Sequence, residues 1–231
     1  MEAPADSFSW DVELPERRGS QLSGPRPRAT LTIDSTHHGL ERVAIPLSVG
    51  KALKSKHDSE ELTPASRAEL LYAVREMSAQ HASMRIERLV DKRDYSAQEM
   101  DDKLRMDGYS SSIREAAIAR AVDANIINDS RYASIFIRTK LSSGWGSMRI
   151  ERELRRRGID IRDVDGWPHE FLGEEDEFER ALAVASSRRI SPKNGFQKLV
   201  RFLCGRGFSL DTSMRAARQV IDDNERAALE D

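Results

Sequence analysis

The feature of this sequence that most constrains its fold is a short motif that occurs three times. Each copy reads an apolar residue, three residues, Leu, three residues, Gly, an apolar residue and then Ser or Asp. The copies occupy residues 100–110, 150–160 and 199–209, so their leucines lie 50 and 49 residues apart. Self-similarity at a nearly constant period is typical of proteins built from similar supersecondary units that pack on their neighbours.

The residue types of the motif predict a short helix that ends at a fixed point. Two apolar residues four positions apart place a core-facing stripe on a helix, and glycine permits the left-handed conformation that ends it. We expect the apolar residue after glycine to fold back onto the helix, and the Ser or Asp to cap the next one. Helical spacing of apolar residues over 129–141 and 174–189 predicts one more helix in the second and third units. Three units of three short helices are therefore expected.

Proline and glycine indicate where the helical region begins. Six prolines lie in the first 64 residues, and the next one along the chain is Pro168. Because both residues are unfavourable inside helices, the region from about Ala65 onward should be almost entirely α-helical. We expect a long leading helix between Ala65 and Arg93, and another that starts at Ala97 and is capped by Ser96. Pro168 predicts a short or broken helix at the end of the second unit.

The N-terminal residues have a different character. Residues 1–28 mix Pro, Gly, Ser, Arg and Glu with little periodicity, which is typical of a disordered tail. Two β-prone runs, at residues 30–33 and 42–45, flank a His-His-Gly turn and predict a β-hairpin. A short helix is expected to follow between Pro46 and Lys54.

Together these patterns predict an all-α fold, an elongated tandem array of three-helix repeats with a small N-terminal β-hairpin and a disordered N-terminal tail. The predicted divisions are the tail (1–28), the hairpin, helix and linker (29–63), the first repeat with its long leading helix (64–128), the second repeat (129–173) and the third repeat (174–231).

Composition and motif content limit the classes of function. The sequence holds no catalytic, nucleotide-binding or metal-binding motif, so we expect no enzyme, no cofactor and no metal site. It lacks a secretory signal and any apolar run long enough to span a membrane, and we expect a cytoplasmic monomer. The single cysteine, Cys204, excludes an internal disulfide, and its apolar neighbours predict a buried thiol.

Charge is unevenly distributed although the net charge is only −2. Residues 130–157 hold eight bases and two acids, residues 186–210 hold six bases and no acid, and the first copy of the motif is acidic. Such stretches indicate either a solvated outer face or a surface for an anion or nucleic acid, and charge alone does not separate the two. We expect Trp145, between two glycines, to pack in the core rather than stack on bases. The residues predicted to contact a partner or nucleic acid are Arg131, Arg138, Lys140, Arg149, Arg152, Arg156, Arg188, Arg189, Lys198 and Arg201.

The sequence around the second copy of the motif resembles the RecX family of recombination regulators. The residues that carry the resemblance are Asn128–Ala133, Phe136–Arg138, Gly144–Gly146, Arg149, Ile150, Glu153, Leu154, Gly158 and Ile159. Residues 94–109 look like the first repeat of that family and residues 202–209 like its last. The resemblance thus covers about residues 95–220, and it implies tandem three-helix repeats without catalytic residues.

The partner that the resemblance implies is the RecA recombinase filament. We therefore expect a non-catalytic regulator that binds the RecA–DNA filament and modulates, mostly by inhibition, recombinase, ATPase and co-protease activity in DNA repair and the SOS response. The alternative, which the two basic stretches favour, is a stand-alone helical regulatory protein that binds single- or double-stranded DNA.

Overall fold

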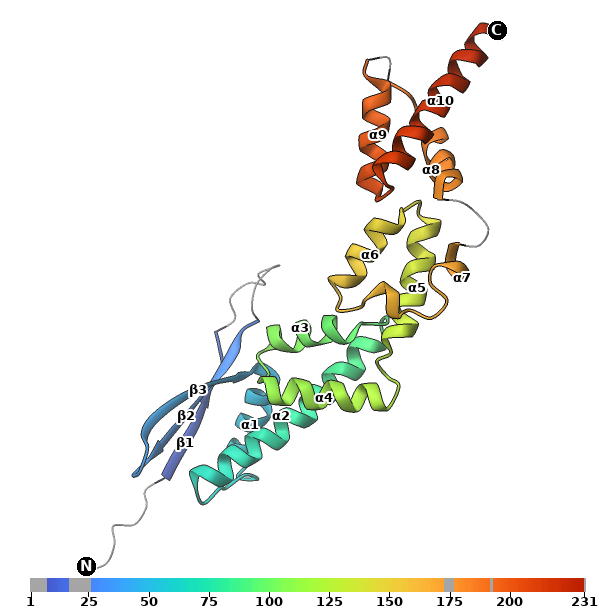
Figure 1. Cartoon of the computed structure of the whole chain (residues 1–231). Coiled ribbons are helices and arrows are strands. Elements are labelled where there is room, and N and C mark those ends of the chain that lie inside the picture. Colours follow the sequence, from blue (N-terminus) through green and yellow to red (C-terminus); the bar gives the residue numbers. More distant parts are fainter. Residues whose placement is uncertain (1–7, 17–25, 173–176, 192, 231) are drawn as a thin grey trace, which may run out of the picture. The chain divides into compact units, whose positions relative to one another are not determined.

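The computed structural model describes residues 8–16, 26–172, 177–191 and 193–230. Over these residues the chain is mostly helical, with a small antiparallel sheet near its N-terminus (Figure 1). The chain divides into two compact units, Met1–Asn128 and Asp129–Asp231. No helix within the described ranges is both long enough and apolar enough to cross a membrane.

The sheet has three strands, so the predicted two-stranded hairpin was incomplete. Strands β1 (Phe8–Glu13), β2 (Arg28–Ser35) and β3 (Gly39–Pro46) pair antiparallel in the order β1-β2-β3. The prediction of disorder was wrong for β1, which alternates apolar and polar residues and buries Val12 against the core of its unit. The rest of the predicted tail up to residue 25, apart from residues 14–16, lies outside the described residues.

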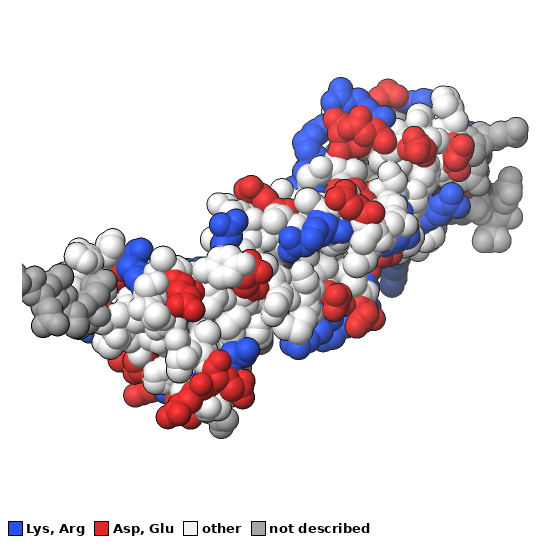
Figure 2. All heavy atoms as spheres, turned by 90° about the horizontal axis from the view of Figure 1, so that it is seen from below, with Lys and Arg blue, Asp and Glu red and all other residues white. Residues whose placement is uncertain are grey.

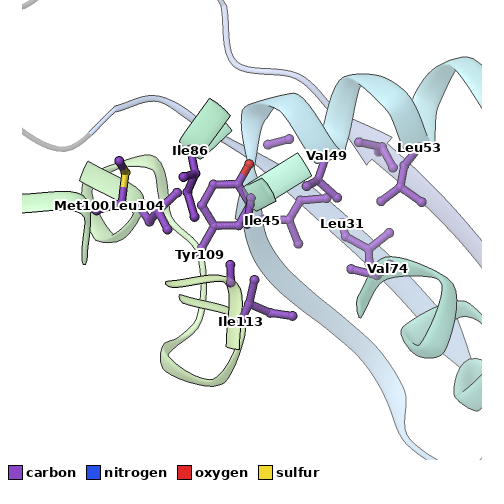
Figure 3. Packing of buried hydrophobic residues seen from close by; sticks show 14 of the residues in the cluster. Leu31, Ile45, Val49, Leu53, Val74, Ile86, Met100, Leu104, Tyr109 and Ile113 are labelled. Atoms are coloured by element: carbon purple, nitrogen blue, oxygen red, sulfur yellow. The ribbon is translucent and has the colours of Figure 1, made fainter. Parts of the chain in front are cut away.

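Four helices complete the first unit, and they agree closely with the pattern of the sequence. Their bounds are Leu47–Asp58 (α1), Arg67–Val90 (α2), Ala97–Asp107 (α3) and Ser111–Asp123 (α4). Helix α1 runs past the predicted end at Lys54, and α3 begins at Ala97 as predicted, with the Ser96 hydroxyl accepting from the Glu99 N–H. One apolar core joins the sheet and these helices. Figure 3 shows Tyr109, the residue after the first corner glycine, among Ile45, Ile86, Leu104 and Ile113.

The second unit contains the remaining helices and two apolar clusters. Its helices are Asp129–Ser142 (α5), Ser147–Arg155 (α6), the 3-10 turn Ile161–Asp163 (η1), His169–Leu172 (α7), Glu177–Ser186 (α8), Gly195–Arg206 (α9) and Leu210–Glu230 (α10). One cluster gathers residues of α5, α6 and the η1 region, and the other gathers residues of α8, α9 and α10. Helix α7, with four residues, begins directly after Pro168 and confirms the predicted short helix. The exact repeat boundaries stay a prediction.

The three motif copies end in the same backbone geometry, which confirms the predicted glycine corner. Gly108, Gly158 and Gly207 have φ of +97°, +77° and +96°. After each of them, the next N–H donates to the motif leucine carbonyl at 3.1–3.2 Å, and that next residue, Tyr109, Ile159 or Phe208, is buried. Asp160 and Ser209 cap the following turns with their side chains, whereas Ser110 does not.

Cys204 is exposed, so the prediction of a buried thiol was wrong. Leu199 and Leu203 form the buried stripe of α9, and Cys204 lies one residue, or about 100° of helical rotation, beyond it. Its apolar neighbours in sequence were therefore a poor guide to its own direction.

Candidate functional site

All ten of the basic residues predicted to contact a partner lie in the second unit. Three are on α5, two on α6, two on α9, and three just beyond helix ends. In chain order they are Arg131, Arg138 and Lys140 (α5), Arg149 and Arg152 (α6), Arg156 after α6, Arg188 and Arg189 after α8, and Lys198 and Arg201 (α9).

Helices α6 and α9 carry bases at equivalent positions of the motif. In each helix one base lies directly before the first residue of the buried stripe, at Arg149 in α6 and at Lys198 in α9. A second base lies two positions after that stripe residue, at Arg152 in α6 and at Arg201 in α9. These positions lie on the side of each helix away from its buried stripe. Arg152, Lys198 and Arg201 are exposed, whereas Arg149 is half-buried. Of these four equivalent positions, three are therefore exposed to solvent, and only Arg149 is drawn inward.

Arg149 and Lys140 are two predicted residues that the fold brings to one side chain, the indole of Trp145. The Arg149 guanidinium carbon lies 3.8 Å from the ring centroid and the Lys140 Nζ 4.9 Å from it. Trp145 packs on the second apolar cluster and meets Phe136 edge to face at 6.3 Å, as its predicted core role requires. The Arg149 Nη1 also donates to the Gly205 carbonyl at 3.2 Å. These two bases thus belong to the packing of the unit.

The start of α6 is joined to the end of α9 through the backbone. The N–H of Gly146 donates to the Arg206 carbonyl at 2.9 Å, and the N–H of Met148 donates to the Gly207 carbonyl at 3.2 Å. Free N–H groups at one helix start are thus satisfied by free carbonyls at another helix end. A Cβ on Gly146 would lie 2.3 Å from the Gly207 carbonyl, so only glycine permits this approach. The contact fixes the basic faces of α6 and α9 in one rigid arrangement.

Two arginines at this joint were absent from the predicted site. Arg206 donates to the Ser143 carbonyl at 2.8 Å, and Arg180 donates to the Trp145 carbonyl at 2.7 Å. Arg206 lies between two glycines of the third motif copy, and this position is the sequence feature that could have indicated its role at the joint. Arg180 had no comparable signal in the sequence.

The other predicted residues are spread over the unit rather than gathered at one point. Arg138 lies over the Phe171 ring at 5.3 Å and Arg188 over the Phe202 ring at 4.1 Å. Lys198 donates to the Ser191 hydroxyl at 2.7 Å. Three bases make no hydrogen bond or ion pair within 4 Å among the described residues: Arg152, Arg189 and Arg201. Of the remaining two bases, Arg131 is half-buried. Arg156 is exposed and is paired with Glu153 at 3.4 Å.

Arg157, which was not among the predicted residues, has an internal role. It donates to both the Glu153 carboxylate, at 2.8 Å, and the Tyr132 hydroxyl, at 3.0 Å. The hydrogen bond from Arg157 is the main reason why the pKa of Glu153 is lowered from its usual value. The base is therefore occupied in holding α6 onto α5.

The acidic first copy differs because its charges are neutralised within its own unit. Asp101 pairs with Arg114 at 2.7 Å, and Asp107 pairs with Arg85 at 2.8 Å. Asp102 pairs with Arg105, and Asp107 also pairs with Arg26 at 3.0 Å. On the face of the molecule that Figure 2 shows, basic and acidic side chains are interspersed. The candidate contact points are therefore Arg152 and Arg201, the bases on α6 and α9 that make no hydrogen bond or ion pair among the described residues.

Comparison with known proteins identifies the family. A family model described as RecX, second three-helix domain, matches residues 128–165. The regulatory protein RecX of Chromohalobacter salexigens is 33% identical over 142 residues, which cover 58% of this chain and 91% of that protein. The regulatory protein RecX of Pseudomonas entomophila is 33% identical over 128 residues, covering 53% of this chain and 81% of that protein. This chain belongs to the RecX family.

The fold agrees with this assignment. A crystal structure of regulatory protein RecX superposes with a TM-score of 0.52 at 18% identity, covering 94% of this chain and 99% of that one. The similar proteins carry the name regulatory protein RecX. Among the described residues no group of His, Cys, Asp and Glu could hold a metal ion.

Proposed function

We propose that this RecX-family chain binds the RecA–DNA filament and modulates, mostly by inhibition, its recombinase, ATPase and co-protease activities in DNA repair and the SOS response. It acts as a cytoplasmic monomer without a cofactor. The observation that carries the proposal is the pair of exposed bases at equivalent positions of α6 and α9, Arg152 and Arg201. The backbone joint at Gly146 and Gly207 holds these two positions in a fixed relation.

A repeated, rigid pair of bases suits a partner whose negative charges are themselves periodic. A filament of protein on DNA presents such a surface, and pre-organised bases lose little conformational entropy when they bind it. The unpaired state of Arg152 and Arg201 leaves their charges available to the partner.

The test is a titration of purified protein into RecA filaments on single-stranded DNA while ATP hydrolysis is recorded. Substoichiometric protein should lower the rates of ATP hydrolysis and strand exchange. An unchanged ATPase rate at every ratio up to a molar excess would contradict the proposal.

A second candidate function is direct DNA binding without RecA, which the exposed bases of α9 also favour. Affinity for DNA alone should then fall with salt, with a log–log slope of roughly −0.7 per phosphate contact on single strands and −0.9 on duplex. Binding that requires RecA at every salt concentration favours the filament.

A further inference from the structure

The first unit contains a cavity of about 320 Å³ that the proposed function does not use. The first turn of α1, one face of α2 and the corner after α3 line it, together with residues that precede β2. Its volume is in the range of small-molecule sites. The residues of its wall decide which class of ligand it can bind.

The walls of the cavity carry an excess of positive charge. Arg85 and Arg88 come from α2, Lys51 from α1 and Arg26 from the segment before β2, whereas Asp107 is the only acid among the described residues that line the cavity. Arg26 and Arg85 both pair with Asp107, at 3.0 and 2.8 Å. Lys51 and Arg88 are exposed and form no ion pair within the described part of the chain. Two cations are thus left without a counter-charge at one opening.

The backbone at the cavity adds to this positive potential. Helix α1 starts at its wall after Pro46, with no side chain capping its first turn and no acid in that turn. The first N–H groups of a helix are free donors at the positive end of its dipole. Burial, and secondly the nearby Arg88, lower the pKa of His81, another wall residue.

The remaining wall is apolar. Pro27 and Met84 lie on it, and the buried Tyr109 ring is held by a 3.1 Å hydrogen bond between its hydroxyl and that of Ser48. A ligand that fits such a cavity carries an anion at one end and an apolar or aromatic group at the other.

We propose that this cavity binds a phosphate-bearing ligand of about mononucleotide size. Lys51, Arg88 and the first turn of α1 hold the phosphate, and the apolar part of the ligand lies against Pro27 and Met84. The phosphate comes either from a free nucleotide or from a nucleic-acid strand whose end enters the cavity. This site is independent of the proposed function, because neither α6 nor α9 takes part in it.

Calorimetric titration of the full-length protein tests the proposal, with adenosine 5′-monophosphate, inorganic pyrophosphate and a short oligodeoxythymidylate as separate probes at about 50 mM salt, where screening is modest. Lys51→Gln/Arg88→Gln should weaken binding about tenfold, because two charge-assisted contacts to phosphate are lost. The matched control is Lys56→Gln/Arg75→Gln, which also removes one base from α1 and one from α2, both outside the cavity wall. Circular dichroism checks that both variants are folded.

The probes separate the sources of the phosphate. Cavity-dependent binding of the mononucleotide assigns the site to a free nucleotide, and cavity-dependent binding of the oligonucleotide alone assigns it to a strand. If only pyrophosphate shows cavity-dependent binding, the phosphate site is supported, but the apolar wall does not contribute to ligand binding. The proposal is overturned if no probe binds, or if the cavity variant and the matched control lose affinity equally.

Discussion

The corners after α3 and α9 have almost the same backbone but different surroundings. Gly108 and Gly207 have φ of +97° and +96° and end helices whose motif leucines are fully buried. A Cβ on Gly108 would meet the side chain of Arg28, with its nearest atom at 2.8 Å. A Cβ on Gly207 would lie 2.3 Å from the Cβ of Arg149 and 2.6 Å from its backbone nitrogen.

The same contrast holds for charge. On α3 the acids are paired with arginines of their own unit, as Asp101 is with Arg114. On α6 and α9 the equivalent surface carries Arg152 and Arg201 without an ion pair among the described residues. The same helical motif thus forms internal ion pairs in the first unit. In the second unit it forms the joint between α6 and α9 and leaves exposed bases that a partner can contact.

The largest effect should come from replacing the third corner glycine. Gly207→Ala combines a left-handed backbone with a contact that only backbone movement can relieve, so we expect a loss of about 3 kcal/mol in the free energy of unfolding. Gly108→Ala should cost about 1 to 2 kcal/mol, because the Arg28 side chain can move away. Urea denaturation of both variants measures the difference.

Gly205→Ala is the control for these variants. It lies inside α9 with open space where its Cβ would be, and alanine there should leave stability unchanged or raise it by up to about 1 kcal/mol. If Gly207→Ala proved no more harmful than Gly108→Ala, the joint between α6 and α9 would not be as described.

A smaller effect should separate the two bases of α6. Arg149→Met removes a guanidinium that stacks on Trp145 and bonds to the Gly205 carbonyl, with an expected loss of about 1 to 2 kcal/mol. Arg152→Met should change stability by less than about 0.5 kcal/mol, because that side chain is exposed. Thermal unfolding compares them, and equal losses would mean that Arg149 has no structural role.

The smallest stability effect concerns the paired acids of the first copy. Asp101→Asn breaks an ion pair in which both side chains are mostly buried, and we expect a loss of up to about 1 kcal/mol. Asp102→Asn, whose pair with Arg105 is largely exposed, should have no measurable effect. Denaturant midpoints of the two variants test this order, and the reverse order would argue against internal neutralisation by Asp101.

The corner geometry could be predicted because its causes are local. The apolar pair, the glycine and the following apolar residue each act within one helical turn, and Leu154 with Gly158 behaves as Leu104 with Gly108 does. The cap of α3 by Ser96 and the short helix after Pro168 could be predicted for the same reason, because each depends on neighbouring residues.

What depends on distant partners could not be predicted in the same way. Strand β1 alternates apolar and polar residues over only six positions, which was too short a signal to predict a strand that pairs with β2. Gly146 contacts Gly207 from a distant part of the sequence, and beside this contact Arg149 packs on Trp145 while Arg152 stays exposed. Charge counts along the sequence treated those two arginines alike.

The measurement that tests the central claim most directly is affinity for preassembled RecA filaments on single-stranded DNA, set beside affinity for the bare strand at the same salt. Arg152→Glu/Arg201→Glu should weaken filament binding by about tenfold or more. Arg42→Glu/Arg120→Glu makes the same charge change at exposed positions of the first unit and should alter it less than about twofold. Equal losses in the two variants, or bare DNA bound as tightly as the filament, would contradict the account.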